Sequence, residues 1–351
     1  MTFCPDLTVR CEEQINPSKQ EHYTMTELPK RILIATDGSE NATLALQAAI
    51  DISNAAGSEL HLVHAWLEPS YPQSGATTQK SRGELEGEAR ELLRLQARLA
   101  AAAGATVAGK HLRKGNPAQE ITTLAEEIGA GMVVVGSRGL GALKRLVLGS
   151  VSKEVVRAAS RPVLVIRGEW PPSRIVVGDD LSEAAGRAGK IAAGIGELYG
   201  APVLLTMAYL PGKWYIDYAA HSRRARETER GIGRKLRGRS DSLRRALEKK
   251  PATEVAPRHP DDMLREASEE RATLVAVGSR GLGVAKRALL GSASDGVLKA
   301  AGGPVLIVPS SAGAGSPKDD NAPKHPRHRR RQAPAPKTPR RSNPNTRARG
   351  Y

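Results

Sequence analysis

The chain alternates short aliphatic runs with longer segments whose apolar residues recur at helical spacing. Continuous apolar runs of this length are typical of buried strands, and glycines mark the ends of several helical segments. In the first half, strands are expected at 31–36, 59–66, more weakly 106–112, 132–136 and 162–167. Helices are expected at about 39–56, 84–103, 117–128 and from Ser150 onward. Five strands alternating with four helices predict a doubly wound α/β fold with a parallel sheet.

The second half repeats this order. Strands expected at 174–180, 202–209, 274–278 and 304–309 match the first, second, fourth and fifth strands of the first half at offsets of 142 or 143 residues. Such self-similarity indicates the tandem duplication of a whole domain. We therefore predict two domains, 29–168 and 174–310, each a five-stranded parallel sheet flanked by helices, with the short linker GEWPPS between them.

The two ends of the chain differ from the rest. Residues 1–28 show no periodic pattern and are expected to form a flexible arm, although Met25, just before the first strand, could instead be the native start. Residues 311–351 contain seven prolines and eleven Lys or Arg against Asp319 and Asp320, so they hold +9 of the net charge of +16. Since this segment has no Val, Ile, Leu, Met, Phe or Trp, we predict a disordered basic tail.

Composition excludes several classes of protein. The two cysteines, Cys4 and Cys11, have no His or Cys nearby at metal-ligand spacing, which argues against a disulfide scaffold or structural zinc. No run approaches the about 18 apolar residues of a membrane helix, and no signal peptide is evident. We expect a cytoplasmic protein with no membrane partner. His61 and His64 lie on one strand and have no carboxylate or thiol partners at metal-ligand spacing. We therefore interpret them as packed side chains rather than metal ligands.

One fifteen-residue stretch follows the fourth strand of each half. GSRGLGALKRLVLGS (136–150) returns as GSRGLGVAKRALLGS (278–292) with eleven identical letters. The carboxyl ends of strands are where open α/β sheets bind ligands. We expect Gly136 and Gly139 to turn the backbone sharply and expose N–H groups. Gly149 and Ser150 should open a helix, capped by Ser150, whose first N–H groups and positive dipole end attract an anion.

These parts together describe a phosphate site. The chain has no G-x-x-x-x-G-K-[ST] loop, and GSRGLG does not follow the first strand, so neither a phosphate-loop ATPase nor a nicotinamide-type site is supported. The alternative is that the glycines only form turns. The second copy, of the same fifteen-residue length, argues against this alternative. Basic side chains recur in both copies and either steer phosphates or simply face solvent: Arg138, Lys144 and Arg145, then Arg280, Lys286 and Arg287.

The pattern G-x-x-G, nine residues, then G-[ST], in a small α/β domain whose first strand ends near Asp, resembles the ATP-binding class of the universal stress protein family. The resemblance covers about 29–310 as two tandem domains. It implies the strand order 3-2-1-4-5, ATP across the ends of strands 1, 2 and 4, and contact between the halves through their fifth strands, whose edges would otherwise be exposed. The motif residues are Gly136, Gly139, Gly149 and Ser150 in the first copy and Gly278, Gly281, Gly291 and Ser292 in the second.

The resemblance also assigns further residues to ATP. Asp37, with Asp180 as its counterpart, would lie near the ribose and the phosphate-bound Mg²⁺, and the backbone of Ala65 or of Ala208 would contact the adenine. The second copy reads GDDLSE where the first reads ATDGSE, so Asp179 adds a carboxylate that should weaken phosphate binding unless Mg²⁺ mediates. The remaining positions implied for nucleotide binding are Ala35, Thr36, Arg138 and Val151 in the first domain and Gly178, Arg280 and Ala293 in the second.

For function, the sequence predicts a tandem ATP-binding stress-response protein that acts as a nucleotide-dependent regulator. No G-x-S-x-G elbow, Cys/His pair or convergent carboxylates indicate catalysis, so any ATP hydrolysis should be slow. One alternative is a weak ATP hydrolase of the adenine-nucleotide-binding α/β superfamily. Another is a protein that binds nucleic acid or another polyanion non-specifically through residues 311–351, together with the basic segment 221–250. Homodimer formation stays open.

Overall fold

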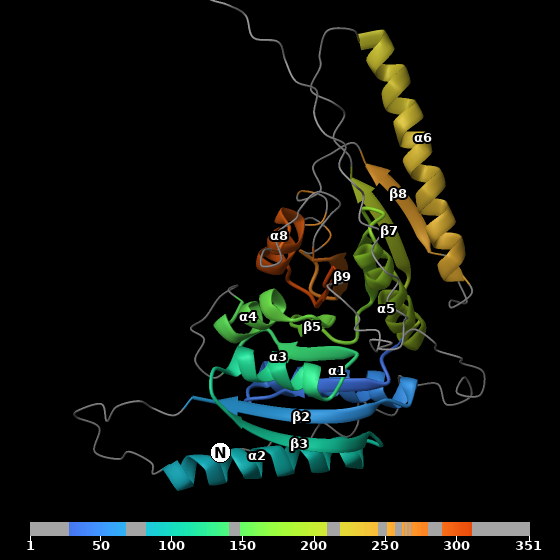
Figure 1. Ribbon diagram of the computed structural model, residues 1–351. Coiled ribbons are helices and arrows are strands. Elements are labelled where there is room, and N and C mark those ends of the chain that lie inside the picture. The colour runs from blue at the N-terminus through green and yellow to red at the C-terminus, as the bar shows by residue number, and fades with distance from the viewer. Residues whose placement is uncertain are drawn as a thin grey trace, which may run out of the picture. The chain divides into compact units, whose positions relative to one another are not determined.

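The computed structural model describes residues 28–67, 82–139, 148–208, 218–244, 251–256, 262, 264, 267, 269–279 and 290–310. The predicted tail, and the predicted arm apart from Leu28, lie outside these residues. The described chain folds into alternating strands and helices (Figure 1). No helix in this part of the chain is long and apolar enough to cross a membrane.

The strands and helices of the first half lie at the predicted places. Ser39 caps the first helix, which ends at Gly57 with a left-handed φ of 62°, and Asn116 caps the third. The strands are β1 (Arg31–Ala35), β2 (Glu59–Trp66), β3 (Thr106–Lys114), β4 (Met132–Gly136) and β5 (Val163–Ile166). The helices are α1 (Glu40–Ala56), α2 (Arg82–Ala102), α3 (Pro117–Glu127) and α4 (Ser150–Ala158).

The second half repeats this arrangement. Its strands are β6 (Arg174–Gly178), β7 (Val203–Ala208), β8 (Ala252–Ala256), β9 (Thr273–Gly278) and β10 (Val305–Val308). Its described helices are α5 (Glu183–Tyr199), α6 (Tyr218–Leu243) and α8 (Ser292–Ala300). β8 has no counterpart among the predicted strands, because this five-residue strand, ATEVA, carries Glu254 at its centre and lacks an aliphatic run. The basic helix α6 stands in the position that α2 has in the first half.

All ten described strands form one sheet, in the order β3-β2-β1-β4-β5-β10-β9-β6-β7-β8. Each half therefore has the predicted order 3-2-1-4-5, and its neighbouring strands are parallel. The halves join where β5 pairs with β10 in antiparallel orientation, with Leu164 opposite Leu306. This pairing covers the two fifth-strand edges, as expected from the cost of leaving a strand edge open.

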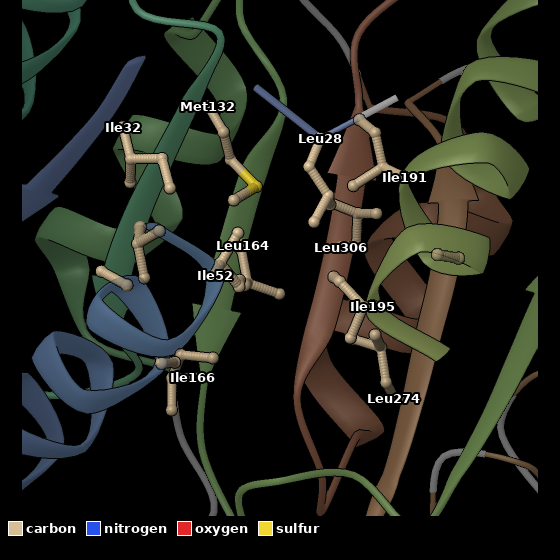
Figure 2. Packing of buried hydrophobic residues seen from close by; sticks show 14 of the residues in the cluster. Leu28, Ile32, Ile52, Met132, Leu164, Ile166, Ile191, Ile195, Leu274 and Leu306 are labelled. Atoms are coloured by element: carbon tan, nitrogen blue, oxygen red, sulfur yellow. The ribbon is translucent and has the colours of Figure 1, made fainter. Parts of the chain in front are cut away.

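Neighbouring side chains of a strand point to opposite faces of the sheet, so the core has two layers. Ile32 and Ile34 pack on the face that α1, α2, α5 and α6 cover, whereas Leu33 packs on the face of α3, α4 and α8. The first layer continues through the junction between the halves, so that Leu164 and Leu306 belong to one hydrophobic cluster (Figure 2). The two halves therefore share a core as well as a sheet.

Leu28 ties the start of the described chain to the second half. Its side chain is 7% exposed and belongs to the same cluster as Ile191 and Ile195 of α5 (Figure 2). A Cβ built on Gly194 would lie 3.0 Å from two carbon atoms of this leucine. The absence of a side chain at Gly194 thus lets Leu28, which precedes β1, pack closely against a helix of the other half.

Arg167, one residue beyond β5, reaches the end of α8. Its guanidinium is buried and donates hydrogen bonds from Nη1 to the Ala301 carbonyl at 2.7 Å and from Nη2 to the Leu298 carbonyl at 2.9 Å. Carbonyls at a helix C-terminus favour a cation. Burial, with a smaller contribution from the charge of Arg138, lowers the pKa of Arg167 to about 10, so the side chain stays charged at neutral pH and holds the two halves together.

Candidate functional site

The carboxyl ends of β1 and β4 lie side by side in the first half. Ala35 is the register partner of both Val63 in β2 and Val135 in β4. The Thr36 N–H continues the pairing by donating to the Val63 carbonyl at 2.9 Å. The residues that follow these strands therefore gather at one edge of the sheet, which we call the first site: Ala35–Asp37, Ala65, Gly136–Gly139 and Gly149–Val151.

Asp37 and Gly139 meet at this edge. The Ser39 N–H donates to Asp37 Oδ1 at 3.1 Å, which fixes one oxygen of the carboxylate. A Cβ built on Gly139 would lie 2.1 Å from the other oxygen, Oδ2. Only glycine therefore leaves this carboxylate in place, and the two motif residues that the sequence assigned to one site are in contact range.

Ser39 connects the two loops of the first site. Its Oγ accepts from the Ala42 N–H at 3.2 Å, as the cap of α1, and donates to the Arg138 carbonyl at 3.2 Å. The turn after β1 is thus bonded to the glycine loop after β4. Ser39 was not among the predicted site residues, although a serine directly before a helix is a strong capping signal.

The prediction that Gly136 turns the backbone sharply is wrong. Gly136 is the last residue of β4, and neither it nor Gly139 has a positive φ. A Cβ on Gly136 would instead lie 2.7 Å from the backbone C and O of Asn41 and 2.9 Å from the N of Ala42. Close approach of the first turn of α1, and not left-handed geometry, is what requires glycine here.

The prediction that Ser150 caps α4 is also wrong. Gly149 occupies the cap position and Ser150 is the first helical residue, so the Ser150 hydroxyl lies one residue too far along to act as the cap. No side chain in the described residues caps this helix, in contrast to α1 and α3. The first N–H groups of α4 therefore receive no cap from a described side chain, and Ser150 and Val151 are exposed.

Backbone and side-chain bonds hold this helix start against β4. The Gly149 N–H donates to the Ser137 carbonyl at 2.8 Å. The Ser152 Oγ donates to the Gly136 carbonyl at 2.7 Å. Ser152 was missed in the sequence analysis, although Ser294 recurs at the matching position of the second copy and donates to the Gly278 carbonyl at 2.6 Å.

The second half builds the same frame, which we call the second site: Gly178–Asp180, Ala208, Gly278 and Gly291–Ala293. Gly291 caps α8 without a side-chain bond, and its N–H donates to the Ser279 carbonyl at 2.8 Å. The Ser182 N–H donates to Asp180 Oδ1 at 3.0 Å, as Ser39 does to Asp37. The remaining predicted positions lie outside the described residues: Arg280, Gly281, Lys144, Arg145, Lys286 and Arg287.

The second site differs from the first at Asp179. This residue occupies the position of Thr36 in the first half. Its N–H donates to the Thr206 carbonyl at 2.9 Å, as the Thr36 N–H donates to the Val63 carbonyl. Its Oδ1 accepts from the Leu181 N–H at 2.8 Å, and Leu181 has a φ of 69° where Gly38 has 79°. The buried carboxylate thus supports a left-handed turn at a non-glycine residue, which costs conformational energy.

The carboxylate of Asp179 is buried and pairs with an arginine of α6. Its side chain is 1% exposed, and Oδ2 lies 3.4 Å from Nε of Arg239, which reaches down from α6. Burial raises the pKa of Asp179, and the positive charge of Arg239 opposes that rise. The additional carboxylate that the sequence places beside Asp180 is therefore buried, and α6 supplies its counter-charge.

The two strand histidines are packed, as interpreted from the sequence. His61 Nδ1 lies 3.1 Å from His111 Nε2, with the rings stacked at a centroid distance of 5.3 Å. His64 Nδ1 lies 2.7 Å from the Thr36 carbonyl. In the described part of the chain no group of three or more His, Cys, Asp or Glu side chains could hold a metal ion.

Comparisons with known proteins match both halves. The model of the universal stress protein family matches residues 29–167 and 172–309. The universal stress protein YxiE of Bacillus subtilis is 34% identical over 146 residues, which are 39% of this chain and 98% of that protein. A universal stress protein of Staphylococcus haemolyticus is 36% identical over 148 residues, which are 41% of this chain and 87% of that protein.

Among solved structures, the fold is similar to that of a universal stress protein from Archaeoglobus fulgidus. The two chains are 23% identical, with a TM-score of 0.54 over 80% of this chain and 97% of that one. The bacterial relatives each correspond to about one half of this chain, whereas the archaeal structure spans most of it. With the family model matched in both halves, this chain belongs to the universal stress protein family.

Proposed function

We propose that the chain binds ATP with Mg²⁺ at the first site and at the second site, and that nucleotide occupancy regulates a partner. The observation that carries the proposal is the start of α4 and of α8, which no described side chain caps, together with an aspartate in each site that accepts from a serine N–H. An uncapped helix N-terminus offers N–H groups and a positive dipole end to a phosphate.

The residues of the first site fit the parts of this ligand. The N–H groups of Ser150 and Val151 would hold phosphate oxygens, and the Ser150 hydroxyl, free of a capping role, would add a donor. Asp37 would bind the ribose or a phosphate-bound Mg²⁺, which supplies positive charge when present. Ala65, two residues beyond the register partner of Ala35, would offer its backbone to the adenine edge.

The second site is proposed to bind the same ligand. The main argument against it was the additional carboxylate of Asp179, and this group is buried and paired with Arg239. The backbone bonds around Gly291 and Ser182 repeat those of the first site. We therefore expect two ATP molecules per chain, which act as bound regulators and are not rapidly hydrolysed.

Calorimetric titration of nucleotide-free full-length protein with Mg-ATP tests the proposal. Gly139→Ala should weaken binding to the first site, because the added Cβ displaces the Asp37 carboxylate. Gly87→Ala is the matched control, because a Cβ at this exposed position of α2 meets nothing within 4 Å. Failure of the unmodified protein to bind Mg-ATP, or equal loss of binding in the two variants, would contradict the proposal.

A further inference from the structure

The helix α6 carries far more positive charge than its counterpart in the first half. Residues 218–243 contain eight Lys or Arg against three Asp or Glu, whereas residues 82–102 of α2 contain four of each. Both helices follow the second strand of their half and cover the same face of the sheet. Since the fold is the same, the fold alone does not require the difference in charge.

One face of α6 is fixed to the sheet. Leu236 and Leu243 are buried, at 0% and 4% exposed, in the cluster that also contains residues of β7. The buried Ser240 Oγ donates to the Pro251 carbonyl at 2.7 Å, just before β8. Figure 1 shows α6 lying along β8. The orientation of the helix, and so the direction of its other face, is set by these contacts.

The opposite face presents a row of arginines to solvent. Arg230, Arg234 and Arg237 are exposed and occupy positions i, i+4 and i+7, which follow one line along a helix. The rise of a helix separates their Cα atoms by about 6 Å and about 4.5 Å. Arg244 continues the row beyond the exposed Asp241. We call these four arginines the α6 row.

In the described part of the chain, the arginines of the α6 row lack the ion pairs that Arg90 and Arg94 make on α2. On α2, Arg90 pairs with Glu86, and Arg94 lies 3.4 Å from Glu91. Within the described residues, no ion pair or hydrogen bond involves the guanidinium of Arg230, Arg234 or Arg237. Arg239, on the inner side of α6, instead pairs with the buried Asp179. The outer arginines are thus the ones left for an external anion.

We propose that the α6 row is a docking surface for duplex nucleic acid, whose phosphodiester backbone it contacts without reading the bases. A straight row of several unpaired guanidinium groups matches a linear array of phosphates, because arginine binds phosphate oxygens with a fixed fork of donors. Residues 227–244 contain no aromatic side chain, so they offer nothing on which unpaired bases could stack. This favours a duplex over a single strand.

The surface is less suited to a lipid membrane. Interfacial helices insert large apolar side chains next to their basic ones. The exposed large apolar side chains of the described residues are Leu67, Leu95, Leu99 and Val151, and none of them belongs to α6. The inference concerns α6 and does not depend on ATP binding at either site.

Fluorescence anisotropy with a labelled duplex of about two helical turns and random sequence tests the proposal in the full chain. The variant R230Q/R234Q/R237Q should bind more weakly and should reduce the slope of log K against log salt by about 2.7, since each lost phosphate contact contributes about 0.9. The matched control R90Q/R94Q/R98Q on α2 should keep the slope of the unmodified protein. Circular dichroism confirms that both variants are folded.

Residues 311–351 are also basic, so binding of the unmodified chain to the duplex does not test the α6 row by itself. The test is the difference in slope between the two triple variants. Equal slopes for the α6 variant and the unmodified chain would overturn the proposal. So would an equal loss in the α2 control, which would indicate only a response to net charge. Binding that depends on the α6 row with vesicles containing phosphatidylserine, but not with the duplex, would assign the surface to membranes and would likewise overturn it.

Discussion

The hydroxyl of Tyr199 donates a 2.7 Å hydrogen bond to Oδ2 of Asp51, and this bond joins the last residue of α5 to the middle of α1. The Trp170 indole of the linker donates to the same oxygen at 3.3 Å, and its ring meets Tyr199 edge-on at a centroid distance of 5.5 Å. Gln47 donates to the other oxygen at 2.7 Å. A small polar cluster thus links both halves and the linker within a largely apolar layer.

Removing the Tyr199 hydroxyl should loosen this junction. Tyr199→Phe leaves the ring in place but takes one donor from the partly buried carboxylate, and we expect a loss of about 1–2 kcal/mol in the free energy of unfolding. Urea denaturation followed by circular dichroism measures the loss. Leu99→Ala, at an exposed side chain of α2, is the control and should change the free energy little. A Tyr199→Phe variant as stable as the unmodified protein would show that the bond contributes nothing.

Asp51 should make stability depend on pH in an unusual direction. Burial raises the pKa of this carboxyl above its usual value of 3.8, even though hydrogen bonds from Tyr199, Gln47 and Trp170 oppose the rise. The folded state therefore holds the proton more tightly than the unfolded state, so the contribution of this group to stability falls as pH rises from about 4 through the raised pKa.

The variant Asp51→Asn isolates this effect, because it removes the titrating group at the same position. Subtracting the free energy of unfolding of Asp51→Asn from that of the unmodified protein, at several pH values between about 4 and about 7, should give a difference that decreases as pH increases. A difference that grows with pH would mean that the folded state favours the charged form, contrary to the raised pKa.

The strands of this fold were predictable where both faces of the strand are buried. MVVVG and PVLVIR read as strands because each contains an uninterrupted aliphatic run, and β4 and β5 are buried along almost their whole length. β8, at the edge of the sheet, has Glu254 in its centre and gave no such run. The position of the glycine loops after the fourth strand of each half followed from the same strand assignments.

The reasons for individual site residues were less predictable. Gly136 is required by the backbone of Asn41, and the direction of the Asp179 carboxylate is set by Arg239, so both depend on contacts between distant parts of the chain. No local pattern contains such information. The capping role expected of Ser150 failed by one residue, which is within the usual uncertainty of a helix boundary.

A side-chain cap introduced at the start of α4 should lower the affinity for ATP without lowering the stability of the protein. In Gly149→Asp the new carboxylate can accept from the first N–H groups of α4, but its Cβ would lie 3.2 Å from the Ser137 carbonyl oxygen, so we expect the two effects to offset and the melting temperature to change little. The same carboxylate competes with a phosphate for those groups, and we expect ATP affinity at the first site to fall at least about tenfold. Calorimetry and thermal melting measure the two effects. Gly87→Asp adds the same charge to exposed α2 and should leave ATP affinity intact, and tight binding by Gly149→Asp would contradict the proposed phosphate position.

The pairing of Asp179 with Arg239 should be visible as a non-additive pair of substitutions. Arg239→Met leaves the buried carboxylate without its counter-charge, and we expect a loss of about 2–3 kcal/mol, reduced somewhat because Arg239 is partly exposed.

Asp179→Thr provides the matched rescue, because threonine stands at this position in the first half, where the Thr36 hydroxyl accepts from the Gly38 N–H at 3.3 Å. In the Arg239→Met background, Asp179→Thr removes the unpaired charge and still offers an acceptor to the Leu181 N–H. We therefore expect the double variant to be more stable than Arg239→Met alone, with a coupling energy of about 1 kcal/mol or more. Urea denaturation of the four proteins gives this coupling directly, and strictly additive effects would show that α6 does not neutralise Asp179.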